Sequence, residues 1–120
     1  MRMDEVFICK KCNSKAFYEE LKVNYFKCTV CNSYFRIPAR DRIEMISDAG
    51  SFEELWADMR LDNPLGFPGY EEKLLKAERA SGLKEAVLTG TCLIDGIKTC
   101  IYIMDPRYMM ASMGVVVGEK

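Results

Sequence analysis

The sequence predicts a small all-β ribbon built around four cysteines, followed by a mixed α/β part made of helices and then a β-hairpin. Two Cys-x-x-Cys pairs lie among short aromatic runs between residues 7 and 37. Apolar residues recur at helical spacing between residues 38 and 82, and an Asp-Gly dipeptide separates two β-rich runs near the end of the chain. We therefore expect one domain over residues 1–37 and a second over residues 38–120.

Length and composition are those of a folded chain. With 120 residues, of which 49% are hydrophobic, the chain is close to the commonest size of one domain. The apolar run at residues 113–118 is far shorter than the roughly 20 residues that cross a bilayer. The N-terminus has no signal-peptide core, so we expect a cytoplasmic protein whose cysteines bind metal or stay reduced.

The cysteine pairs are the strongest chemical signal. Cys9 and Cys12 form one pair and Cys28 and Cys31 the other, with fifteen residues between the pairs. This is the spacing of a four-cysteine zinc site, and four thiolates leave no open position, which indicates one structural Zn²⁺. Unliganded thiols, two disulfides or an iron centre of the same geometry are the alternatives.

The residues around the cysteines support a turn at each pair. Asn13 and Asn32 directly follow the two pairs, and asparagine tolerates the left-handed backbone that such turns need. The chain contains no histidine, which excludes a Ser-His or Cys-His nucleophile system within it.

Three helices are expected after the ribbon. The stretch "PARDRIEMISDAG" predicts a helix that starts near Pro38 and ends before Gly50. Ser51 and Glu54 form a capping-box pattern, which predicts a second short helix over "SFEELWADM". The stretch "YEEKLLKAERASG" predicts a third helix that stops at Gly82.

The Asp95-Gly96 dipeptide predicts a β-hairpin with a two-residue turn. This register places Ile94 opposite Ile97 and puts Cys92 and Cys100 on opposite faces. We expect both cysteines to be small buried apolar residues rather than ligands.

Charge is uneven along the chain, because residues 1–42 carry nine Lys or Arg against five Asp or Glu. A basic ribbon permits a second interpretation, a stand-alone zinc-ribbon module that binds nucleic acid. Alternatively, its aromatic residues are strand residues that cover the core of the ribbon. The residues in question are Lys10, Lys11, Lys15, Lys22, Lys27 and Arg36, with Tyr25, Phe26, Tyr34 and Phe35 as stacking surfaces.

An ordered set of segments resembles a known family. The stretches "CTVCNSYFRIPARDRIEMISDAGSFEEL", "NPLGFPGYEEKL", "SGLKEAVLTG", "IDGIKTCIYIMD" and "SMGVVVGEK" occur in this order. Together they resemble the beginning of the β subunit of bacterial acetyl-CoA carboxylase carboxyltransferase. The resemblance runs from about Cys9 to Lys120.

The resemblance implies a fold and an activity. Cys9, Cys12, Cys28 and Cys31 would be the ligands of an N-terminal zinc ribbon, and residues 38–120 would begin a truncated crotonase-like α/β domain. The family enzyme transfers a carboxyl group from carboxybiotin, held on a biotin carboxyl carrier protein, to acetyl-CoA, and the product malonyl-CoA enters fatty-acid synthesis. Partners would be a carboxyltransferase α subunit, in an α2β2 heterotetramer, and biotin carboxylase.

The resemblance also bears on the tail, although it assigns no catalytic residue to this chain. Backbone N–H groups can stabilise an enolate and a biotin oxygen, and glycine lets a backbone approach a ligand closely. Gly114 and Gly118 are therefore candidates for substrate binding or for close helix packing. Met110 and Ala111 stand where the family usually carries Gly-Gly. Family subunits are much longer, so we expect this chain to be a fragment that is inactive alone.

Overall fold

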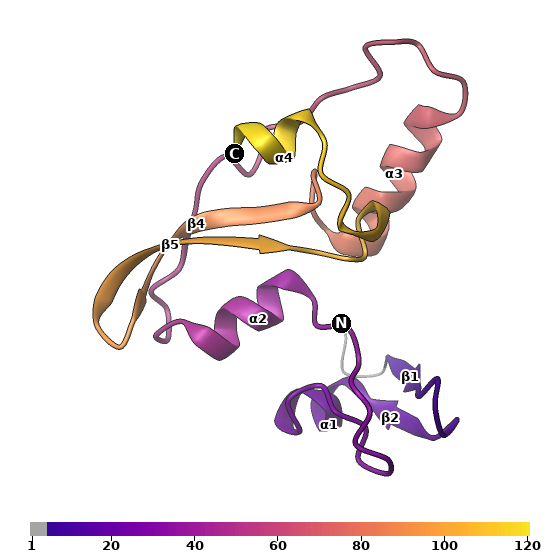
Figure 1. Ribbon diagram of the computed structural model, residues 1–120, viewed down its shortest axis with the longest axis vertical. Coiled ribbons are helices and arrows are strands. Elements are labelled where there is room, and N and C mark those ends of the chain that lie inside the picture. The colour runs from indigo at the N-terminus through magenta and orange to yellow at the C-terminus, as the bar shows by residue number, and fades with distance from the viewer. Residues whose placement is uncertain (1–4) are drawn as a thin grey trace. The chain divides into compact units, whose positions relative to one another are not determined.

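The computed structural model describes residues 5–120, and the chain divides into two compact units between Ile37 and Pro38. The first unit begins with two short antiparallel strands, β1 (Val6–Ile8) and β2 (Lys15–Phe17). Helix α1 (Tyr18–Val23) follows β2 directly (Figure 1). A second turn then brings the chain back on itself.

A small aromatic core lies beneath these elements. The rings of Tyr18 and Phe26 meet edge to face with centroids 6.1 Å apart, and those of Phe7 and Phe35 do so at 6.4 Å. Aromatic side chains bury much area per residue, which suits a unit with few positions available for a core. The core consists of the buried Ala16, Tyr18, Leu21 and Phe26 with the partly buried Phe7, Phe35 and Ile37.

The prediction that the ribbon is all-β is wrong, because Tyr18–Val23 is helical. Tyr18 and Leu21, three residues apart, are both buried, as one face of a helix requires. The Glu20 carboxylate accepts a hydrogen bond from the Phe17 N–H at 2.9 Å and so satisfies a free donor at the helix start. These local contacts outweigh the strand preference of the aromatic residues.

The second unit is a three-stranded antiparallel sheet with helices on both faces. Its strands are β3 (Glu53–Glu54), β4 (Val87–Ile94) and β5 (Ile97–Met104), in the order β3-β4-β5. Helix α2 (Ala39–Ile46) lies along one side of the β4–β5 hairpin, and α3 (Tyr70–Ser81) lies on the other side (Figure 1). The helices predicted after Pro38 and before Gly82 are therefore confirmed.

Two neighbouring residues of β4 show how the layers are joined, because successive side chains of a strand point to opposite faces. Leu88 belongs to one core and Val87 to the other. The first core contains Ala39, Ile43, Leu83, Leu88 and Ile103, and so joins α2 to the sheet. The second contains Leu74, Ala77, Ala86, Val87, Tyr108 and Val117, and so joins α3 and the tail to the sheet.

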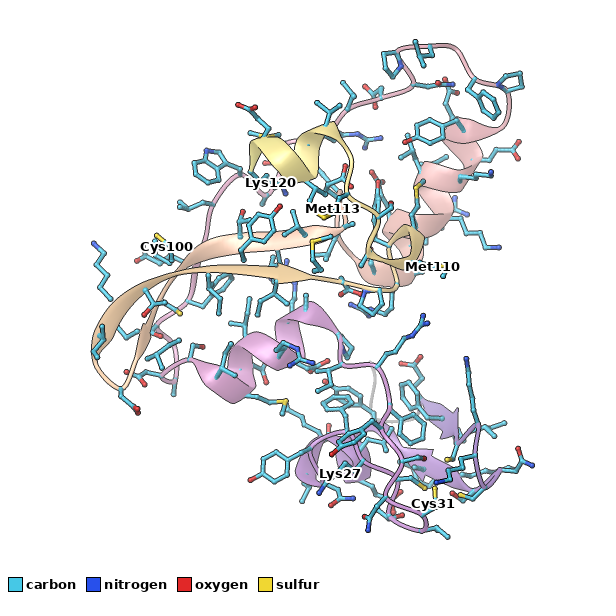
Figure 2. The ribbon with its side chains drawn as sticks, in the orientation of Figure 1. Lys27, Cys31, Cys100, Met110, Met113 and Lys120 are labelled. Carbon is cyan, nitrogen blue, oxygen red and sulfur yellow. The ribbon has the colours of Figure 1, made fainter. Side chains whose placement is uncertain are left out.

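The tail consists of a 3-10 turn, η1 (Met109–Ala111), and helix α4 (Val115–Glu119). Met109, Met110 and Ala111 all have positive φ, at 43°, 57° and 61°. None of the three is glycine, so the turn holds backbone strain. Figure 2 shows Met110 on this turn, ahead of α4.

The predicted hairpin is confirmed in its turn and its register. Ile94 lies opposite Ile97, and Asp95 and Gly96 both have positive φ, at 50° and 77°. This is the backbone that a two-residue hairpin turn prefers. The carboxylate of Asp48 accepts hydrogen bonds from the N–H groups of Asp95 and Gly96 at 3.0 and 2.8 Å, which fixes the turn against the end of α2.

The helix predicted over "SFEELWADM" is absent, and this stretch instead contains β3. The Ser51 hydroxyl donates to the Asp48 carbonyl at 2.7 Å and accepts from the Leu93 N–H at 3.1 Å, so it serves a turn and not a helix cap. A Cβ on Gly90 would lie 2.2 Å from the Glu53 carbonyl oxygen. Glycine at this position of β4 is what lets β3 pair so closely.

The prediction of two buried hairpin cysteines is correct for one of them. Cys92 is buried on the sheet face that α2 covers. Cys100 is exposed, because it lies on the opposite face, paired with Thr91 towards the hairpin end (Figure 2). Alternation along the strands predicts on which face of the sheet each cysteine lies. It does not predict how far the helices cover that face, because this depends on residues elsewhere in the chain.

Candidate metal centre

The two cysteine pairs lie in turns with the same hydrogen bonds. In the first turn the Cys9 N–H donates to the Ser14 carbonyl at 2.9 Å, and the Asn13 N–H donates to the Cys9 carbonyl at 2.9 Å. In the second turn the matching bonds, from Cys28 to Ser33 and from Asn32 to Cys28, measure 2.8 and 3.0 Å. Each turn thus directs its two cysteine side chains to one side.

The predicted left-handed asparagines are confirmed, since Asn13 has φ of 60° and Asn32 of 59°. Asparagine is one of the few residues other than glycine that visits this region readily. Each asparagine reverses the chain directly after its cysteine pair, and so lets the following serine turn back towards the sulfur atoms.

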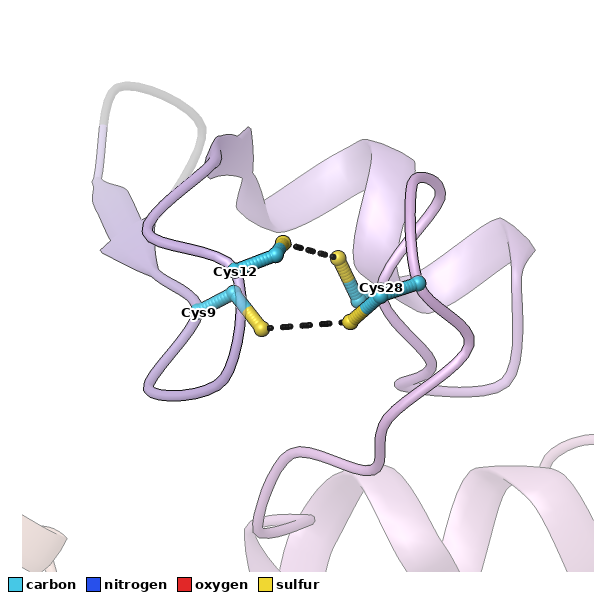
Figure 3. A group of neighbouring side chains, drawn as sticks. Cys9, Cys12 and Cys28 are labelled. Carbon is cyan, nitrogen blue, oxygen red and sulfur yellow. Dashed lines mark hydrogen bonds between the residues drawn. The ribbon is translucent and has the colours of Figure 1, made fainter.

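The four cysteine sulfurs lie close together. The Sγ atoms of Cys9 and Cys31 are 3.6 Å apart, as are those of Cys12 and Cys28, and all four lie within 4.8 Å of one another (Figure 3). A tetrahedral ion with metal–sulfur bonds of about 2.3 Å sets neighbouring sulfurs about 3.8 Å apart. The cluster therefore has the dimensions of a four-thiolate metal site and could hold one ion.

The centre is partly shielded from solvent. Cys9 and Cys28 are buried, Cys31 is half-buried and Cys12 is exposed. Partial burial limits competition from water, while the exposed edge at Cys12 leaves a path for an ion to enter. Four protein ligands would complete the tetrahedral coordination of an ion and leave no position for water or substrate. This donor set therefore suits a structural ion and not a catalytic one.

Two serine hydroxyls lie against the sulfurs. The Ser33 hydroxyl is 3.0 Å from the Cys9 sulfur and 3.1 Å from the Cys31 sulfur. The Ser14 hydroxyl is 3.0 Å from the sulfur of Cys12 and 3.2 Å from that of Cys28. The sequence prediction missed both serines, although "CKKCNS" and "CTVCNS" carry the same Asn-Ser pair after the second cysteine.

The serines also change the acidity of the thiols. The Ser33 hydroxyl is the main cause that lowers the pKa of Cys9 from 9.0 to about 6, and the Ser14 hydroxyl is the main cause of the lowered pKa of Cys28. The Ser14 hydroxyl also favours the thiolate of Cys12, but desolvation and the neighbouring sulfurs of Cys28 and Cys31 outweigh it, and the pKa of Cys12 is raised. Two of the four cysteines are thus predisposed to the thiolate form that metals bind.

The candidate glycines of the tail lie in the second unit. Gly114 precedes α4 with φ of −102°, and Gly118 lies within α4. Both are exposed, and a Cβ on either would meet no atom within 4 Å. Close helix packing is therefore not the reason for glycine at either position among the described residues, and substrate binding stays a prediction.

The aromatic residues proposed to stack on nucleic-acid bases divide into two pairs. Phe26 is buried and Phe35 packs against the same core, as the alternative interpretation of these aromatics predicts. Tyr25 and Tyr34 are 67% and 84% exposed. Two exposed tyrosines by themselves do not favour the nucleic-acid module over the main interpretation.

Among the described residues, no helix combines the length and apolar character that crossing a membrane requires.

The paired turns and the four converging sulfurs define a zinc-ribbon-like unit that could hold a metal ion, followed along the chain by a small α/β unit. No family model matches the chain. Curated proteins do match it, and over 112 residues, 93% of its length, it is similar to proteins named acetyl-coenzyme A carboxylase carboxyl transferase subunit beta.

Three relatives show the extent of this similarity. The chain is 46% identical to the subunit of Clostridium botulinum (strain Alaska E43 / Type E3), of which it covers 38%. It is 48% identical to the subunit of Pelotomaculum thermopropionicum and 46% identical to that of Carboxydothermus hydrogenoformans, and it covers 40% of each. The chain therefore spans about two fifths of the length of these relatives.

Proposed function

We propose that this chain is a segment of the carboxyltransferase component of acetyl-CoA carboxylase, which moves a carboxyl group from carboxybiotin to acetyl-CoA to form malonyl-CoA. The observation that carries this proposal is the identity of 44–48% to carboxyl transferase beta subunits over 112 residues. The aligned 112 residues cover both units of the chain and not one short motif alone.

Within this proposal, residues 1–37 are a zinc ribbon with a structural Zn²⁺ held by Cys9, Cys12, Cys28 and Cys31. The sulfur separations of 3.6 Å support zinc, because they lie close to the edge of a zinc–thiolate tetrahedron. When bound, the ion would supply folding energy to a unit whose apolar core is small. The ribbon would then be a fixed surface and not a reaction centre.

Residues 38–120 are the first part of a crotonase-like domain in the same proposal, and Gly114 and Gly118 form part of its substrate surface. Both glycines are exposed and face open space, so a ligand could approach the backbone of α4 without meeting a side chain. The rest of the site would come from other residues of a full subunit and from a carboxyltransferase α subunit, with biotin delivered on its carrier protein.

A segment exchange tests the proposed activity. The aligned residues of the Pelotomaculum thermopropionicum subunit are replaced by those of this chain, and the chimera is mixed with the α subunit, carboxybiotin carrier and acetyl-CoA. Malonyl-CoA formation well above that of the subunit lacking the segment is the expected result. A chimera that folds and binds the α subunit but forms no malonyl-CoA would overturn the proposal.

A further inference from the structure

Each of the two serine hydroxyls in the metal unit contacts one sulfur of its own turn and one sulfur of the other turn. Ser14 belongs to the first turn and touches Cys12 of that turn and Cys28 of the second. Ser33 belongs to the second turn and touches Cys31 of that turn and Cys9 of the first. The two serines therefore share no sulfur, and together they reach all four.

The backbone fixes the serines where their hydroxyls can do this. The carbonyl of Ser14 accepts the N–H of Cys9, and the carbonyl of Ser33 accepts the N–H of Cys28, at 2.9 and 2.8 Å. Each serine is thus held by the first cysteine of its own turn. Both serines are only half-buried, so the polar side chain is not needed to fill a core position.

Hydrogen-bond donors around a metal–thiolate centre stabilise its charge. Four thiolates and a divalent ion together carry an excess of negative charge, and a hydroxyl that donates to a sulfur withdraws part of it. Groups that hydrogen-bond to metal ligands also fix the orientation of the ligands, and their loss typically lowers metal affinity by about 10- to 100-fold. Ser14 and Ser33 are placed to do both.

We propose that Ser14 and Ser33 are a pair of positioning residues that link the two cysteine turns around a bound metal ion, raise its affinity and slow its release. The proposal rests on the metal centre proposed above. It leaves the ligand set at four sulfurs and adds two hydroxyls that contact those sulfurs without binding the ion.

Zinc competition on the full 120-residue chain tests this proposal. The chain is loaded with zinc, and a chromophoric chelator then reports the affinity and the rate of zinc release for wild type, Ser14→Ala and Ser33→Ala. Each variant is expected to bind zinc about 10-fold more weakly and to release it faster. Ser14→Thr and Ser33→Thr keep the hydroxyl and are expected to restore most of the affinity.

Thr29→Ala is the matched control, because Thr29 is an exposed hydroxyl residue between Cys28 and Cys31 of the second turn. Its affinity should equal that of wild type. Cobalt substitution adds a readout that simple loss of folding would not produce. Removal of a hydroxyl donor leaves the sulfurs more electron-rich, so the sulfur-to-cobalt charge-transfer band should move to lower energy while its intensity still reports four thiolates.

The outcomes separate the two proposals. A wild-type chain that takes up no metal would overturn the metal centre itself. A wild-type chain that binds one zinc, with both alanine variants equal to it in affinity, release rate and cobalt spectrum, would overturn the role of the serines alone.

Discussion

The carboxylate of Asp105 accepts a hydrogen bond from the backbone N–H of Ala39 at 3.0 Å, across 66 residues of sequence. Asp105 is fully buried and also accepts three hydrogen bonds from Arg107, at 2.8 to 3.0 Å. Arg107 in turn donates to the carbonyl of Ser81 at 3.1 Å. One partly buried ion pair thus joins the start of α2, the end of β5 and the end of α3.

Acid should weaken the second unit through Asp105. Burial alone would raise the pKa of Asp105, but hydrogen bonds from Arg107 and from the Ala39 N–H outweigh it and hold this pKa below 3.8. Because its pKa is lower in the folded state, the ionised Asp105 carboxylate stabilises the fold above pH 3.8. This stabilisation is lost as the pH falls through the pKa that Asp105 has in the folded state. Urea unfolding measured from pH 7 downwards should show this loss below pH 4.

Replacing Asp105 tests the assignment. Asp105→Asn leaves Arg107 without its countercharge and should lower the free energy of unfolding at pH 7 by about 3 kcal/mol. The variant should also lose stability less steeply than wild type below pH 4. Asp58→Asn, which removes a surface partner of Lys84, is the control and should change the stability little. An acid profile of Asp105→Asn identical to that of wild type would contradict this account.

Replacing Met110 or Ala111 by glycine should stabilise the folded chain. Both residues have positive φ, and left-handed backbone costs a residue with a Cβ about 1 kcal/mol or more. Glycine removes this cost but gains entropy in the unfolded state, so a net stabilisation of about 0.5 kcal/mol is expected for Met110→Gly and Ala111→Gly. Thermal melting measures it.

Met113 provides the matched control for these variants. It is 78% exposed, as Met110 is at 79%, but it is not among the residues with positive φ. Met113→Gly should therefore destabilise the chain slightly. If Met110→Gly lowers the melting temperature as much as Met113→Gly does, the turn is not strained at Met110.

A side chain at Gly90 should separate β3 from β4. Because the added Cβ would lie 2.2 Å from the Glu53 carbonyl oxygen and 2.7 Å from the Phe52 ring, Gly90→Ala should cost about 2–3 kcal/mol. The N–H of Leu55 donates to the Thr89 carbonyl, so the rate of hydrogen exchange at the Leu55 amide should be higher in Gly90→Ala than in wild type. Gly118→Ala has open space around its Cβ and should be neutral or slightly stabilising.

Loss of one metal ligand should unfold the first unit without unfolding the second. Cys28→Ser is expected to abolish zinc binding, measured as zinc per chain by elemental analysis. Trp56, the single tryptophan of the chain, lies in the second unit, so its emission should not change. Cys100→Ser removes an exposed cysteine of β5 and should keep one zinc per chain. A Cys28→Ser chain that still holds one tightly bound zinc would contradict the ligand assignment.

Features set by a few neighbouring residues could be predicted from the sequence. The hairpin register follows from Asp95-Gly96, and the end of α3 follows from Gly82, which has φ of 70°. The asparagines after the cysteine pairs have the left-handed backbone that their type permits. In each case the backbone conformation is determined by the residue that adopts it.

Features set by distant partners could not be predicted. Ser51 and Glu54 match a helix-capping pattern, but pairing of Glu53–Glu54 with β4 decides their conformation, and that pairing depends on Gly90. The spacing of the cysteines predicted a cluster of four sulfurs, which the structure brings together. It did not single out Ser14 and Ser33, because their contacts cross from one turn to the other.

Strand β5 has consequences for how this chain behaves in solution. Its eight residues have a strand neighbour on one side only within the part of the chain that the structure describes, and Ile97 and Tyr102 are exposed along it. Lys98 is the one charged residue in the strand. Strand edges of this kind pair readily with other chains. Concentrated samples should therefore self-associate through β5. The substitution Tyr102→Lys, which would add a second charge to the strand, is the simplest change expected to keep the chain monomeric.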